Sequence, residues 1–199
     1  GLTKHGLRLQ RGLVYGQKFS FTLQAPDLYL VGQRSFDDLP IPYRAVATDL
    51  ETGEIVVPDR GDLLEAMRAS MAAPGAFPPV EAAGRMLVDG YLRVMLPTEV
   101  VRDMGADVVI AVHPGWSPGQ TPPGTAWDLP SIFLQSNYIL TWSNTAGDLA
   151  AADVGIKVPL ADMPLWDLTQ AARAIAEGRA AVDAHLDALR DLSLPPDEY

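Results

Sequence analysis

Hydrophobic residues come in short blocks separated by turn residues, and this pattern predicts a series of strands. A buried strand is expected over residues 43–48, followed by a turn at 51–54 and a partner strand over 55–57. A further short strand is expected over residues 85–88. Residues 107–112 are apolar after the first position, which is typical of a strand covered on both faces.

Apolar residues at helical spacing predict helices between these strands. The clearest N-terminus is Asp62, a capping residue that precedes Leu63, Leu64 and Met67 on one predicted buried face. Gly105 is expected to cap the C-terminus of a later helix. The expected helices cover residues 17–23, 62–71, 97–104, 129–151 and 167–192, with a last strand over 154–158 and the end of ordered structure at 195–196.

Strand, helix and strand follow one another with short links, so we predict an α/β fold with a mostly parallel central sheet. A length of 199 residues suits a single domain. Within it we expect an irregular entry over residues 1–35, a sheet core over 36–160, and a C-terminal helix and tail over 161–199. The segment 114–130, rich in Pro and Gly, is expected to be a loop inside this domain.

Composition and charge remove several classes of function. The net charge is −10, from 15 Lys and Arg against 25 Asp and Glu, which argues against binding of nucleic acid. The chain has no Cys, so disulfides, thiol catalysis and Cys-ligated metals are excluded. His5, His113 and His185 do not occur at the spacing of metal ligands. The sequence contains no stretch of 18 uninterrupted apolar residues, so it predicts no membrane-spanning helix.

The first residues carry neither an initiator Met nor a signal-peptide pattern, and we interpret them as the interior of a longer protein. Localisation stays open, because a targeting signal would precede Gly1. The 199 residues also contain no Gly-x-Ser-x-Gly, the elbow that presents a nucleophilic serine.

Several blocks of the core occur in a characteristic order. They read Tyr-Arg-Ala-Val-Ala-Thr-Asp at residues 43–49, Ala-Ala-Pro-Gly-Ala-Phe-Pro-Pro-Val at 72–80, Leu-Val-Asp-Gly at 87–90 and Gly-Ala-Asp-Val-Val-Ile-Ala-Val at 105–112. In this order the chain closely resembles the C-terminal half of bacterial patatin-like phospholipases. Residues 11–18 resemble the segment before that core, and residues 152–156 extend the similarity more weakly.

The resemblance implies an α/β sandwich and a serine acyl hydrolase that cleaves lipid esters with a Ser–Asp dyad and needs no cofactor. In that family the serine and a glycine-rich oxyanion loop lie in the N-terminal part, which has no counterpart here. The dyad aspartate lies in an Asp-Gly-Gly or Asp-Gly-Ala motif, which maps onto Asp89-Gly90-Tyr91. The resemblance therefore makes Asp89 the expected base, with Gly90 and Tyr91 beside it.

The chemistry of this position agrees with such a role. A carboxylate at the carboxyl end of a strand lies where ligands meet an α/β sheet, and partial burial would raise its pKa. Gly90 would let the backbone turn sharply. The plainer alternative is that Asp-Gly is a common turn dipeptide. Tyr91 and Arg93 depart from the family pattern, and they could narrow the pocket or alter the pKa of Asp89.

The leading hypothesis is a phospholipase or esterase in which this chain supplies Asp89 and an upstream segment or second chain supplies the serine. The alternatives are a non-catalytic relative that binds lipid or a partner, and an inert fragment. Ser70 is expected in a helix, where packing is the preferred interpretation. For His113 we prefer a solvated strand end over a base or proton shuttle.

Two tryptophans flank the loop rich in Pro and Gly. Trp116 and Trp127 have the amphipathic rings that suit a membrane interface, and we consider such a contact against simple packing of the loop onto the core. The acidic net charge argues against strong attraction to anionic lipid.

Overall fold

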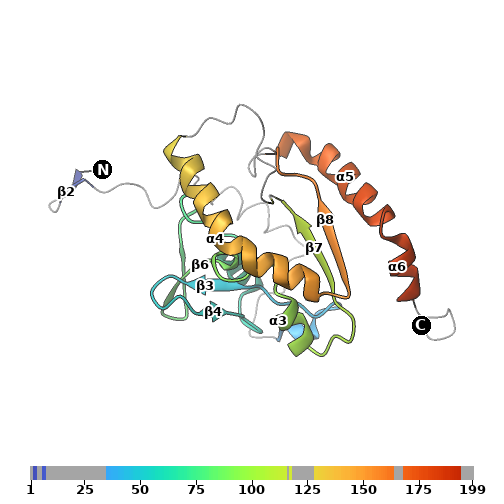
Figure 1. Cartoon of the computed structure of the whole chain (residues 1–199). Coiled ribbons are helices and arrows are strands. Elements are labelled where there is room, and N and C mark those ends of the chain that lie inside the picture. The colour runs from blue at the N-terminus through green and yellow to red at the C-terminus, as the bar shows by residue number, and fades with distance from the viewer. Residues whose placement is uncertain are drawn as a thin grey trace. The chain divides into compact units, whose positions relative to one another are not determined.

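The computed structural model describes residues 2–3, 6–7, 35–115, 117, 128–163 and 168–193 (Figure 1). The chain divides into two compact units, residues 1–95 and residues 96–199, and each is described by itself. Strands and helices occur in both units, which confirms the predicted α/β class. The helix expected over 17–23, the first residue of the helix expected over 167–192 and the tail at 195–196 lie outside the described residues.

An antiparallel sheet forms the centre of the first unit, with the strand order β4-β3-β6-β5. Its strands are β3 (Ala47–Asp49), β4 (Ile55–Val56), β5 (Val80–Ala82) and β6 (Arg85–Asp89). The antiparallel pairing of β3 with β4 agrees with the expected strand, turn and partner strand over residues 43–57. The sheet as a whole differs from the expected mostly parallel sheet, because the short turns that join β3 to β4 and β5 to β6 connect antiparallel neighbours. A separate antiparallel pair joins β1 (Leu2–Thr3) to β2 (Gly6–Leu7).

Helix α2 (Leu63–Ser70) packs against one face of this sheet. As predicted, Asp62 caps it, accepting hydrogen bonds from the backbone N–H groups of Leu64 and Glu65 at 2.8 and 3.1 Å. The buried face is partly different from the prediction: Leu63 is buried, but Leu64 is only half-buried. The small residues of the helix take the innermost positions, which lets the helix approach the sheet closely. The cluster between them contains Ala47, Ala69, Ala72, Val80 and Leu87.

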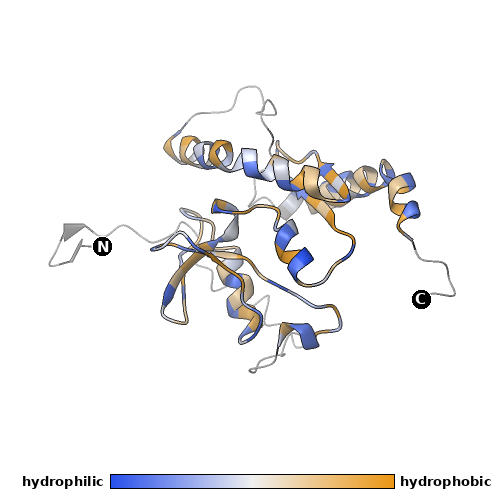
Figure 2. Cartoon of the chain, turned by 60° about the horizontal axis from the view of Figure 1, so that its bottom comes forward, coloured by the Kyte–Doolittle hydropathy of each residue, from blue (hydrophilic) through white to orange (hydrophobic). Residues whose placement is uncertain are grey.

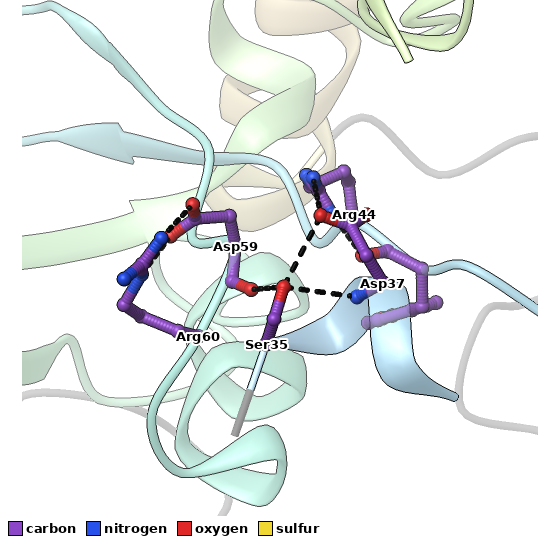
Figure 3. A network of polar contacts seen from close by, with 6 residues as sticks. Ser35, Asp37, Arg44, Asp59 and Arg60 are labelled. Carbon is purple, nitrogen blue, oxygen red and sulfur yellow. Dashed lines mark hydrogen bonds and ion pairs between the residues drawn. The ribbon is translucent and has the colours of Figure 1, made fainter. Parts of the chain in front are cut away.

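A polar network attaches the start of the described core to the loop before α2 (Figure 3). Arg44 makes a two-pronged contact with Asp37, at 2.8 and 3.0 Å, and Asp37 lies in the short helix η2 (Phe36–Asp38). The Ser35 hydroxyl lies between Asp37 and the backbone oxygen of Asp59, while Asp59 pairs with Arg60. The backbone N–H of residue 36 donates to Asp59 at 2.7 Å. The network thus holds two segments together that are remote in sequence.

The second unit contains a strand–helix–strand crossover. Strand β7 (Ile110–Pro114) leads through α4 (Leu129–Ala151) to β8 (Val154–Val158), which pairs with β7 in parallel. This pair confirms the parallel arrangement expected for this part of the chain. Both α4 and β8 begin and end at the predicted residues.

Further helices complete this unit. Helix α3 (Thr98–Asp103) precedes β7 and ends before Gly105, whose φ of +94° fits the predicted C-cap. After β8 come η4 (Leu168–Gln170), α5 (Ala171–Asp183) and α6 (Leu186–Asp191). The single C-terminal helix that we predicted is therefore interrupted between residues 183 and 186. No helix among the described residues is long and apolar enough to cross a membrane.

Strand β7 is covered on one face only, so the expectation of a strand covered on both faces was wrong. Ala111 and His113 are buried, whereas Ile110 and Val112 remain exposed. A continuous run of apolar residues therefore does not correspond to burial on both faces of β7. The strand also begins later than predicted, at Ile110. The backbone N–H of Val109, just before it, donates to the Asp153 carboxylate at 2.8 Å.

Candidate active site

Strand β6 carries the predicted base to its carboxyl end. Asp89 is the last residue of the strand and pairs in register with Ala47 of β3. Its backbone N–H donates to Ala72 at the end of the α2 segment, at 3.1 Å. Its carboxylate accepts a hydrogen bond from the backbone N–H of Tyr91 at 3.0 Å, so Asp89 caps the short helix η3 (Gly90–Leu92). The strand and the cap together fix the position of the carboxylate.

Glycine is required at position 90 for a spatial reason. A Cβ on Gly90 would lie only 2.8 Å from the backbone carbonyl carbon of Val46, and closer still to the attached oxygen. Gly90 does not have the positive φ found at Gly84 or Gly105, so conformational freedom is not the cause. A glycine-dependent turn was expected here, but the requirement for glycine comes from close backbone packing against Val46.

Burial controls the electrostatics of Asp89. It raises the pKa of this carboxyl from 3.8 to about 6, while the Tyr91 N–H acts in the opposite direction. Arg93 is exposed, and no ion pair among the described residues includes Asp89. With a pKa of about 6, the carboxylate is mainly deprotonated at neutral pH and can accept a proton.

Asp49, a second aspartate at a strand end, has a pKa shifted in the opposite direction from that of Asp89. Asp49 ends β3 and is buried, but its carboxylate accepts hydrogen bonds from the N–H groups of Glu51 and Thr52 at 2.9 and 3.4 Å. Arg85 lies 3.4 Å away on β6. These partners, with the Glu51 hydrogen bond first, lower the pKa of Asp49. Asp49 therefore stabilises a turn, whereas Asp89 retains the character of a base.

The expectation for His113 needs correction. Only 3% of this residue is exposed, so it is not a solvated strand end. The ring of Trp142, from α4, meets it edge-on with 5.7 Å between centroids. Burial, and secondarily the charge of Lys157, lower the pKa of His113, which favours the neutral imidazole. Because Trp142 follows His113 far along the chain, no local signal in the sequence indicated this environment.

The other sequence candidates are placed as follows. Ser70 is the last residue of α2 and half-buried, in agreement with a helical position and not a nucleophile elbow. Trp116 and Trp127 lie outside the described residues. Within the ranges that the structure describes, no group of three or more His, Asp or Glu side chains could hold a metal ion.

Comparison with known proteins supports the family resemblance. The family model described as patatin-like phospholipase matches residues 4–102. An uncharacterised NTE family protein of Mycobacterium tuberculosis is 47% identical over 83 residues, which are 42% of this chain and 23% of that protein. The patatin-like phospholipase domain-containing protein 7 of Mus musculus is 40% identical over 84 residues, which are 41% of this chain and 6% of that protein. The matched part thus spans less than a quarter of these relatives, and the resemblance predicted from the sequence is confirmed.

Proposed function

Since residues 4–102 of this chain belong to the patatin-like phospholipase family, we propose that the chain forms part of a lipid acyl hydrolase and that Asp89 is its general base. The observation that carries the proposal is the state of Asp89. Its carboxylate is held at the end of β6 by the Tyr91 N–H, and its pKa is raised by burial to about 6. A base of this strength can accept a proton from a hydroxyl group and return it within one catalytic cycle.

The proposed reaction has two stages. A serine hydroxyl attacks the ester carbonyl while Asp89 accepts its proton, and Asp89 then donates that proton to the departing alcohol as the acyl-enzyme forms. Water next gives a proton to Asp89 and attacks the acyl carbon. The proton returns to the serine oxygen when the fatty acid leaves.

The nucleophile and the oxyanion donors belong to polypeptide outside these 199 residues in this proposal. The sequence holds no Gly-x-Ser-x-Gly, and Ser70 lies at the end of a regular helix. A lone carboxylate cannot carry out acyl transfer, because base, nucleophile and oxyanion donors must converge on one ester. Catalysis therefore requires an added segment or second chain.

Labelling by a fluorophosphonate probe, followed by intact mass, tests the proposal. We expect no adduct on the 199-residue chain and one adduct on a longer polypeptide that joins it to a Gly-x-Ser-x-Gly segment. Asp89→Asn should abolish that labelling, whereas Asp38→Asn, at an exposed aspartate of the same unit, should not. An adduct on the short chain would contradict an external serine. Full labelling of the longer Asp89→Asn polypeptide would contradict the role of Asp89.

A non-catalytic relative that binds lipid or a partner is the second candidate. Tyr91 favours it, because this bulky residue follows Asp89-Gly90 where the family motif has a small residue. Replacing Tyr91 by Gly would distinguish the two functions. If the longer polypeptide is inactive with Tyr91 and gains hydrolysis with Tyr91→Gly, the natural protein is a binding protein whose pocket is blocked. Equal hydrolysis by both supports the enzyme.

A further inference from the structure

The N-terminal half of α4 has an exposed apolar stripe. Its members are between 46% and 81% exposed. A contiguous apolar patch on a surface is more informative than single exposed side chains. At about 100° per residue, they share roughly one third of the helix circumference. The stripe consists of Leu129, Ile132, Phe133, Ile139 and Leu140. Figure 2 shows the apolar colour at this end of the helix.

The opposite face of α4 already has a partner within its own unit. Thr141, Thr145 and Leu149 are buried there, and Leu149 packs in a cluster with Ala111 of β7. The exposed stripe therefore contributes nothing to the core of this unit. Its exposure needs an explanation outside the packing of α4 onto the β7–β8 pair.

The charge pattern narrows the choice of partner. Residues 129–147 contain no Asp, Glu, Lys or Arg. The uncharged Ser136 lies within the arc of the stripe, and the uncharged Gln135 lies beside it. The chain as a whole carries a net charge of −10. A helix with one apolar side and no cations cannot attract anionic lipid, but its apolar area can enter an uncharged interface.

We infer that the apolar stripe of α4 docks on a zwitterionic lipid surface, with the helix lying in the plane of the interface. The inference rests on the proposed function, since a lipid acyl hydrolase meets its substrate at such a surface. The helix has only one apolar side and is not a membrane-crossing helix, which agrees with a position along the interface.

Flotation with phosphatidylcholine vesicles tests the docking with a matched pair of variants. Ile139→Gln changes a stripe residue that is 59% exposed, and Ile175→Gln changes an α5 residue of the same type that is 58% exposed. We expect about tenfold weaker partitioning for Ile139→Gln. Ile175→Gln should bind like the unaltered chain. Both sites are exposed, so circular dichroism should show the same helix content for all variants.

Lipid composition gives a second readout. Replacing part of the phosphatidylcholine by phosphatidylserine should weaken binding, and added salt should restore it, because salt screens the repulsion between the acidic chain and the surface. Equal binding by the stripe variant and the unaltered chain would overturn the inference. Tighter binding to the anionic vesicles would do the same.

Other occupants of the stripe are separate outcomes that would also overturn it. If the chain forms a dimer in sedimentation equilibrium that Ile139→Gln dissociates, a second copy covers the stripe. If the longer polypeptide fails to float while the 199-residue chain does, that polypeptide covers it. The test is independent of catalysis: if the unaltered longer polypeptide hydrolyses a soluble ester but does not bind the vesicles, only the docking is refuted. Vesicle binding without any hydrolysis removes only the proposed activity.

Discussion

Replacing Asp89 by Asn should stabilise the folded protein at neutral pH, and the gain should disappear in acid. Burial raises the pKa of Asp89 to about 6 in the folded protein, against an ordinary value of 3.8. Between these values the folded state binds the proton more tightly than the unfolded chain does. The free energy of unfolding therefore falls as the pH rises from about 4 to above 6.

The size of this effect follows from the difference between the two pKa values. It corresponds to about 3 kcal/mol of stability that is present below the lower value and lost above the higher one. The Asn side chain is uncharged at every pH, so the variant avoids this loss. Its amide oxygen can still accept the hydrogen bond from Tyr91, which preserves the start of η3.

Urea denaturation followed by circular dichroism across this pH range measures the difference. Asp89→Asn should exceed the unaltered chain by up to about 3 kcal/mol above pH 6 and match it in acid. Asp38→Asn, at an exposed aspartate, is the control for removal of one negative charge. A variant no more stable than the unaltered chain at neutral pH would refute the assignment of a raised pKa to this half-buried carboxyl. So would a gain that persists unchanged in acid.

Two further predictions concern close packing and the buried histidine. Gly90→Ala should cost about 1–3 kcal/mol of stability, because the new methyl group meets the Val46 backbone. Gly178→Ala, where a Cβ meets nothing in α5, should instead gain about 0.5–1 kcal/mol, and thermal unfolding that shows the same sign for both would contradict the packing argument. Lys157→Met should raise the pKa of His113, because the ammonium charge helps to lower it. Proton NMR titration of the imidazole measures this, and an unchanged midpoint would refute the contribution of Lys157.

Elements with a strong local pattern could be predicted from the sequence. The apolar spacing of α4 and the short apolar run of β8 predicted both elements, and the predicted first and last residues agree with those observed. Strand β5 was missed, because its three residues follow two prolines and acquire strand geometry only by pairing with β6. The residues of β5 alone therefore do not indicate a strand, because the pairing partner β6 lies beyond the turn.

The same distinction applies to the candidate site. The position of Asp89 at the end of a strand could be predicted from the residues around it, since Leu87, Val88 and Gly90 form a strand followed by a turn. The raised pKa agrees with the expectation that partial burial would raise it, but its size could not be predicted, because burial is produced by residues from distant parts of the chain. His113 shows the limit most clearly: its position at the end of an apolar run suggested exposure, whereas a side chain of α4 covers it.

The parallel pair β7–β8 has a consequence for the order of events during synthesis. Strands β5 and β6 are joined by a turn of only two residues, so this hairpin can close as soon as both strands leave the ribosome. Val109 must instead wait for Asp153, 44 residues further along the chain, before its N–H finds the carboxylate that anchors β7 to β8. Contacts of this range are slow to form, because a long loop must be ordered first. During that interval the apolar residues of β7 have no strand partner in β8, and the nascent second unit is most vulnerable to association with other chains.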